Sequence, residues 1–169
     1  MTKAVIDSTT LICLVHLDLA IKLSQFFQVV LVPDLVQEEV CRKHRFRYRL
    51  KSLYDSGVFR KCKTANEWNR RLLQHDEAID PGEADAITQA QEQDIPVFLG
   101  DEKAARKIAE KMGKKSVGTA AILAKLHIQG ILTGHPKELI RKLQCSKLKY
   151  RISNDVVEEA LKRASEPIL

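Results

Sequence analysis

Short apolar strands alternate with helical patterns along almost the whole chain, and this alternation restricts the fold more than any other feature. Apolar runs typical of buried strands lie at 4–6, 28–32, 58–59, 95–100 and 115–118. Stretches with helical spacing separate these runs. Strands joined by helical crossovers form parallel sheets whose helices pack on both faces. The sequence therefore predicts an α/β protein with a central, mainly parallel sheet.

The helical stretches have recognisable boundaries. Asp7 or Ser8 can cap a first helix, Pro33 ends the second strand, and an Asp-Pro-Gly turn at 80–82 starts a helix at Glu83. The expected helices lie at 11–16, 19–27, 34–42, 46–54, around Trp68, at 83–92, at 102–112, from 119 onward, and at 154–164.

The length of 169 residues suits one domain with a core of its own. We expect a single domain over 1–169, with a basic excursion at about 42–63 and a C-terminal helical tail at about 135–169. No apolar run approaches the roughly 18 residues of a membrane span, and the stretch before Asp7 is too short for a signal peptide. The four cysteines have no paired spacing, which favours reduced thiols in a cytoplasmic protein.

Positive charge is concentrated in one segment. Between Arg42 and Lys63 there are nine basic residues against one acid, so this segment has a net charge of +8. The whole chain has a net charge of +6, so the rest of the chain is slightly negative. Interleaved aromatic residues could stack on unpaired bases while the cations follow a phosphate backbone. The same pattern also fits an amphipathic helix with a solvated face, or a surface for an acidic partner. The candidate nucleic-acid contacts are Arg42, Lys43, Arg45, Arg47, Arg49 and Lys51.

Four carboxylates lie where segments begin or turn. Asp7 and Asp101 each follow a strand, Glu39 lies in a helix, and Glu83 starts one. Ligand chemistry in such sheets gathers at the carboxyl ends of the strands, so these acids could meet at one edge. Like charges that share a pocket are unstable without a divalent cation. The pattern points to metal-assisted chemistry, most plausibly phosphodiester hydrolysis.

Each acid also has a simpler explanation. Asp7 could only cap the following helix, Glu83 could only complement a helix dipole, and Asp101 could be an ordinary cap. The choice of Glu39 over its exposed neighbour Glu38 rests on the buried stripe that brackets it. The strength of the hypothesis lies in all four acids meeting at one edge.

Five segments together resemble the PIN-domain family, in particular the short prokaryotic proteins close to VapC-type toxins of type II toxin–antitoxin pairs. The resemblance covers nearly the whole chain, and the ordered set of motifs is more specific than any one of them. The segments are Asp7-Ser8, Pro33 with 36–40, the acidic turn at 80–87, 99–106, and 117–123.

This resemblance implies a three-layer α/β/α sandwich and a metal-dependent endoribonuclease. It implies catalytic and metal-binding roles for Asp7, Glu39, Glu83 and Asp101, with Mg²⁺ or Mn²⁺ bound. Hard oxygen ligands and scattered histidines disfavour zinc. The supporting residues would be Ser8, Thr119 and Asp85, although Asp85 is expected to point away from Glu83. Many toxin relatives have aspartate at the position of Glu83.

The resemblance also implies an RNA substrate and a possible antitoxin partner. A homodimer is expected from apolar helix faces near 11–27. A non-catalytic nucleic-acid-binding or regulatory PIN relative is the main alternative. A receiver-type phosphoacceptor would need paired acids after the first strand and a lysine after the last, which Asp7 and Gly118-Thr119 do not supply.

Overall fold

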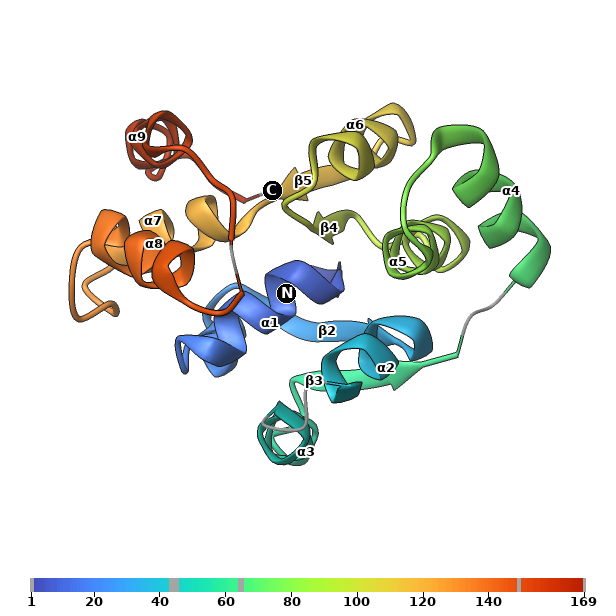
Figure 1. The fold of residues 1–169 in the computed structure, drawn as a ribbon, viewed down its shortest axis with the longest axis horizontal. Coiled ribbons are helices and arrows are strands. Elements are labelled where there is room, and N and C mark those ends of the chain that lie inside the picture. Colours follow the sequence, from blue (N-terminus) through green and yellow to red (C-terminus); the bar gives the residue numbers. More distant parts are fainter. Residues whose placement is uncertain (1, 43–45, 64–65, 149, 169) are drawn as a thin grey trace. The chain divides into compact units, whose positions relative to one another are not determined.

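The computed structural model describes residues 2–42, 46–63, 66–148 and 150–168. Two compact units are distinguished, Met1–Val117 and Gly118–Leu169, and each is described by itself. The single-domain organisation inferred from the sequence stays a prediction. Figure 1 follows the chain through both units. Of the helices in the described ranges, none is both long and apolar enough to cross a membrane.

A five-stranded sheet organises the first unit. Its order is β3-β2-β1-β4-β5, and every neighbouring pair is parallel. All strands therefore end at the same edge. The predicted α/β class with a parallel central sheet flanked by helices is confirmed. The strands are β1 (Thr2–Ile6), β2 (Phe27–Pro33), β3 (Phe59–Cys62), β4 (Val97–Leu99) and β5 (Lys115–Val117).

The helices of the first unit lie close to their expected positions. They are α1 (Ser8–His16), α2 (Asp34–Arg42), α3 (Arg47–Asp55), α4 (Glu67–Glu77), α5 (Pro81–Glu92) and α6 (Lys103–Lys111).

The helical interpretation of 19–27 was wrong in part. The structure has a short 3₁₀ helix, η1 (Ala20–Gln25), and Phe27 already belongs to β2, where it pairs with Thr2 of β1. Asp18 has a φ of 59°, a left-handed conformation that ends α1 and separates it from η1. Pairing with the central strand thus overrides helical spacing at the end of this segment.

The core of the first unit accounts for the unbroken apolar strands. Ala4, Val5 and Ile6 of β1 are all fully buried, as expected for a central strand covered on both faces. On one face, Val5 and Phe98 belong to a buried cluster with apolar residues of α5 and α6. This packing fixes α5 and α6 against the sheet.

The apolar residues of α1 do not form an exposed face. Leu11–Val15 are buried, and of η1 only Ile21 is an exposed large apolar residue. The expectation of exposed apolar faces at 11–27 was therefore wrong, because these residues are used within the chain. The homodimer remains a prediction that this segment does not support.

The second unit is helical. It contains α7 (Thr119–Ile128), α8 (Pro136–Cys145) and α9 (Asn154–Lys162), and α7 packs against both of the others. Lys125 of α7 donates to the carbonyl oxygen of Ala164 at 3.0 Å, and Lys137 pairs with Glu158 at 2.6 Å.

Candidate active site

Asp7 lies at the junction of β1 and α1, where it both caps a helix and presents a second oxygen. Its Oδ1 accepts a hydrogen bond of 2.7 Å from the backbone N–H of Thr10. Its own N–H donates to the carbonyl oxygen of Leu99 at 2.9 Å, which ties it to the end of β4. The side chain is fully buried, and within the described residues Oδ2 has no hydrogen-bond partner. The capping role is therefore real but leaves one carboxylate oxygen available.

Asp101 lies beside Asp7 because β1 and β4 are neighbours in the sheet. The Oγ1 of Thr10 donates to Asp101 Oδ2 at 3.4 Å, so Thr10 contacts both acids. The N-cap position of α6 is Glu102, which makes no side-chain capping bond. Asp101 therefore lies one residue before the N-cap position and is not the cap of α6.

Gly100 allows the close approach of these two strand ends. A Cβ at this position would lie 2.3 Å from the Phe98 ring and 3.0 Å from Asp7 Oδ2. The contact with the ring is closer than packed atoms tolerate and the contact with the carboxylate is tight, so a side chain here would displace the ring of Phe98 and push against Asp7. Glycine is required for space, which the sequence alone did not reveal.

The environment of Asp7 disfavours its charged form. Burial raises its pKa well above the ordinary value, and the nearby charges of Asp101 and, to a smaller extent, Glu83 raise it further. The hydrogen bonds from Thr10 act in the opposite direction. This is the electrostatic pattern of acids that share a site.

Glu83, like Asp7, uses one carboxylate oxygen at a helix start and has its other oxygen buried without a hydrogen bond in the described residues. It forms a capping box at the start of α5, since Glu83 N–H donates to Asp80 Oδ1 at 2.8 Å and Asp80 N–H donates to Glu83 Oε2 at 3.1 Å. Its Oε1 is buried and has no hydrogen-bond partner within the described residues. Burial raises the pKa of Glu83 to about 7, with further contributions from Asp80, Glu102 and Glu39.

Glu39 reaches the same region from α2. It is half-buried whereas Glu38 is exposed, as the stripe of buried residues predicted. Both carboxylate oxygens would lie 3.1 Å from a Cβ on Gly82, in the first turn of α5. The positive end of the α5 dipole is a favourable place for this carboxylate. Glu39 and Glu83 therefore meet at one helix terminus.

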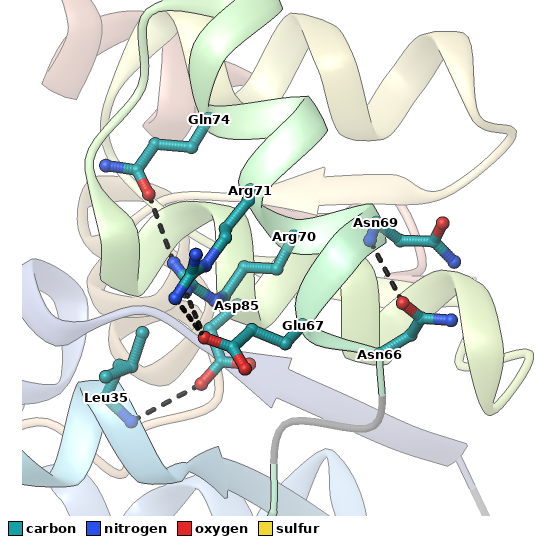
Figure 2. A network of polar contacts seen from close by, with 8 residues as sticks. All are labelled: Leu35, Asn66, Glu67, Asn69, Arg70, Arg71, Gln74 and Asp85. Carbon is teal, nitrogen blue, oxygen red and sulfur yellow. Dashed lines mark hydrogen bonds and ion pairs between the residues drawn. The ribbon is translucent and has the colours of Figure 1, made fainter.

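Asp85 points to a different place from Glu83. It is fully buried, and its Oδ2 accepts a 3.3 Å hydrogen bond from the backbone N–H of Leu35 (Figure 2). Leu35 lies in the first turn of α2, where backbone N–H groups lack intrahelical partners. Asp85 thus caps α2 from a neighbouring helix and holds in place the helix that carries Glu39.

The remaining supporting residues were expected beside the acids. Ser8 is buried as the first residue of α1, directly after Asp7. Thr119 is buried as the first residue of α7, in the unit Gly118–Leu169. The role of Thr119 stays a prediction.

The basic segment combines a buried face with an exposed cationic one. Phe46, Leu50 and Leu53 are buried, as amphipathic spacing predicted. Arg42, Arg47 and Lys51 are exposed. Tyr48, between these cations in α3, is 83% exposed and could stack on a base. The two explanations for this segment are therefore compatible.

Not every proposed nucleic-acid contact is equally placed. Arg49 pairs with Asp18 at 3.0 Å and donates to the carbonyl oxygen of Val15 at 2.7 Å, so it ties α3 to the end of α1. The predicted contacts Lys43 and Arg45 lie outside the described residues.

The donor set fits a hard divalent cation, although the ligands are not fully assembled. Asp7 Oδ2 and Glu83 Oε1 are buried carboxylate oxygens without hydrogen-bond partners in the described ranges. Oxygen donors of this kind suit Mg²⁺ or Mn²⁺. Across the described part of the chain, no three His, Cys, Asp or Glu side chains are arranged to hold one ion. The acids would have to close around the cation.

The fold and this site define an α/β protein with coupled carboxylates at the carboxyl edge of a parallel sheet. A family model described as PIN domain (DUF3368) matches residues 3–166, and the chain belongs to the PIN-domain family. PIN domains are typically nucleases and generally use divalent metal ions. The predicted family is confirmed, which argues against the receiver-type alternative. Comparison with curated proteins and with solved structures gives no significant match.

Proposed function

We propose that this protein is a metal-dependent endoribonuclease of the toxin type, which hydrolyses phosphodiester bonds in RNA. The observation that carries the proposal is the pair of buried carboxylates, Asp7 and Glu83, whose pKa values are raised and whose second oxygens have no hydrogen-bond partner in the described residues. Buried carboxylates with raised pKa values and unsatisfied oxygens are concentrated at functional sites, where a bound ion or substrate can offset their cost.

Four acids would share the work. Asp7, Glu39, Glu83 and Asp101 would hold Mg²⁺ or Mn²⁺. A bound divalent cation supplies an activated water and neutralises charge on the leaving oxygen. Thr10 orients both Asp7 and Asp101 through its hydrogen bonds, and Asp80 orients Glu83 in the capping box.

The exposed basic residues would guide the RNA. Arg42, Arg47 and Lys51 offer positive charge at the surface, and Tyr48 offers a ring for an unpaired base. Separation of these cations from the acids is expected, because the acids must stay anionic to hold the metal.

The remaining parts of the proposal concern context. A toxin of this type would be neutralised by an antitoxin that covers the acids, with an arginine as a suitable contact. We also propose a homodimer and a cytoplasmic location. The four cysteines form no disulfide in the structure, which fits the reduced thiols proposed for a cytoplasmic protein.

A non-catalytic RNA-binding or regulatory PIN protein is the second candidate function. One observation favours it, namely that the described residues contain no preassembled group of three metal-binding side chains. On this account the acids would remain but would bind metal weakly. RNA would still bind at the basic segment.

Cleavage of a mixed-sequence single-stranded RNA in the presence of Mn²⁺ separates the two functions. We expect the wild type to cut the RNA, and a chelator, Asp7→Asn and Asp101→Asn each to abolish cutting. The matched control is Asp155→Asn, which changes an exposed aspartate in α9. RNA that is bound but left intact by the wild type would support the non-catalytic function instead.

A further inference from the structure

Helix α4 exposes large apolar side chains that the proposed nuclease activity does not use. None of its described residues is buried. Trp68 is 73% exposed and Leu72, one turn later, is 50% exposed. Met112, at the end of α6, is a third exposed apolar residue on this side. Exposed apolar residues that gather on one surface, rather than lying singly, are typical of interaction sites.

Leu72 and Met112 border a groove between α4 and α5, and Trp68 lies on α4 one turn before Leu72. The groove has a volume of about 270 Å³, and its walls include Leu72, Leu73 and Met112. Leu73 also packs against the core cluster, so the floor of the groove is continuous with the core. A hydrogen bond of 3.3 Å from Asn69 Nδ2 to Glu92 Oε1 joins the two helices beside it. The groove is therefore fixed by packing and by a polar link.

The rim of the groove is acidic in a chain that is basic overall. Asp76, Glu77 and Glu92 line it, and no lysine or arginine is found among its lining residues in the described chain. Arg71 of α4 is instead paired with Glu67 at 2.6 Å (Figure 2). A chain of net charge +6 thus has an apolar groove whose charged lining residues, in the described part of the chain, are all acidic.

Going beyond the nuclease activity, we propose that this groove binds an amphipathic helix of a partner protein, with leucine-like residues on one face and lysine or arginine at its edges. Helices commonly bind in grooves between two other helices. The 11 residues of α4 extend about 16 Å, which matches three turns of a bound helix.

Charge and burial disfavour other occupants. RNA and anionic membranes would be repelled by the three carboxylates. A second copy of this chain could offer its basic helix α3, but Leu50 and Leu53 of that helix are buried within their own chain. A separate partner with a free apolar face fits the groove better.

Trp68 is the only tryptophan of the chain and lies on α4 one turn before Leu72, so its emission reports on a helix bound along α4 beside the groove. The probe is a synthetic helical peptide with leucines at i, i+3, i+4 and i+7 and lysines beside them. Two further peptides serve as controls, one with glutamate in place of lysine and one with the basic sequence scrambled. We expect the basic amphipathic peptide alone to shift Trp68 emission to shorter wavelength, with an affinity that falls as salt rises.

Two pairs of charge reversals test the acidic rim. Asp76→Lys with Glu77→Lys should weaken peptide binding at least about tenfold, as expected for the loss of two charge contacts. The control, Glu110→Lys with Glu159→Lys, makes the same change in net charge at exposed residues outside the groove and should bind as the wild type does. Circular dichroism checks that both variants fold.

Several results would overturn the proposal. One is the absence of any Trp68 shift with the basic peptide, and another is equal binding of the scrambled or acidic peptide. Equal affinity of the two charge-reversed proteins would also refute it. A Trp68 shift that grows with protein concentration in the absence of peptide would assign the groove to self-association. RNA cleavage is not part of this readout, so failure here leaves the nuclease proposal unaffected.

Discussion

Among the single residues of the site, two buried carboxyl groups are electrostatically unfavourable in their charged forms. Asp7 and Glu83 each use one oxygen to cap a helix, while the other oxygen is buried without a hydrogen-bond partner in the described chain. Their raised pKa values mean that the folded protein favours the protonated forms. A divalent cation at these oxygens would reverse that preference, because it favours the charged forms.

The first prediction concerns the stability of the metal-free protein. The pKa of Glu83 is about 7 in the folded state and 4.5 in the reference state. Its contribution is fully present below the lower value and is lost as pH rises through the higher one, because the unfolded chain then releases its proton more readily. We expect the free energy of unfolding to fall by about 1–3 kcal/mol between about pH 5 and pH 8 in the presence of a chelator.

Glu83→Gln provides the control for this prediction. Urea denaturation of the variant should show a smaller fall over the same pH range, because glutamine does not titrate. Addition of Mn²⁺ to the wild type at the higher pH should restore stability. An equal pH dependence in the wild type and the variant would show that Glu83 is not the group responsible.

Some residues of the site could be predicted from the sequence and others could not. Asp7 and Glu83 were recognisable because each follows a capping pattern at a predicted boundary. Thr10 and Gly100 were not, because their roles depend on contacts with residues distant in sequence. Thr10 meets Asp101 across 91 positions, and a Cβ on Gly100 would meet Asp7 across 93. Only the register of β1 against β4 reveals these contacts.

At the scale of elements, the position of α2 depends on α5. Asp85 of α5 accepts from Leu35 N–H at the start of α2, and Glu39 of α2 lies against Gly82 of α5. One helix therefore supplies Glu83 directly and positions Glu39 through two contacts. The two helices act together in presenting acids to the site.

The second prediction separates a positioning role for Asp85 from a metal-binding role. Asp85→Asn keeps an oxygen that can accept from Leu35, whereas Asp85→Ala removes it. We expect Asp85→Ala to lower stability by about 1–2 kcal/mol, as for loss of a helix cap, and to reduce cleavage. Hydrogen exchange of the amides at the start of α2 should be faster in this variant.

The asparagine variant decides between the two roles. If Asp85 positions α2, Asp85→Asn should keep most of the cleavage activity and the slow exchange of α2. If Asp85 were a metal ligand, the asparagine variant would lose activity as completely as Asp7→Asn does. That outcome would refute the positioning role.

Element boundaries were predictable where local signals agreed. The Asp80-Pro81-Gly82-Glu83 turn predicted a helix from Glu83 to Glu92, and the structure has α5 over Pro81–Glu92, two residues longer at its start because Asp80 is the N-cap. The helix predicted at 19–27 from local spacing was wrong at its end, because spacing carries no information on the pairing of Phe27 with Thr2. The sequence likewise suggested a dimer surface at 11–27, but Leu11–Val15 are buried within the chain. An apolar stripe predicts that a helix face is covered, but it does not predict whether the same chain or a second copy covers it.

At the scale of the whole molecule, the fold class followed from the alternation of strands and helices, whereas the strand order required the structure. The concentration of positive charge between Arg42 and Lys63 could also be predicted from the sequence. The structure adds that Arg49 is held by Asp18 and Val15, so the exposed cations of the basic segment are not equivalent.

The third prediction follows from the exposed cations of α3. Arg47→Glu with Lys51→Glu should weaken binding of single-stranded RNA and lower the slope of log affinity against log salt by about 1–1.5, the value for two lost phosphate contacts. The control is Lys107→Glu with Lys142→Glu, which makes an equal charge change at exposed sites outside the basic segment. Equal losses in both variants would show a response to net charge alone.

Anomalous scattering from crystals grown with Mn²⁺ tests whether the four acids form a metal site. We expect a manganese peak in contact with the carboxylates of Asp7 and Asp101, with Glu83 and Glu39 turned toward it, and no such peak in crystals of Asp7→Asn. A peak bound by other residues, or none beside Asp7 in the wild type at saturating Mn²⁺, would contradict the assignment of these four acids as a metal site.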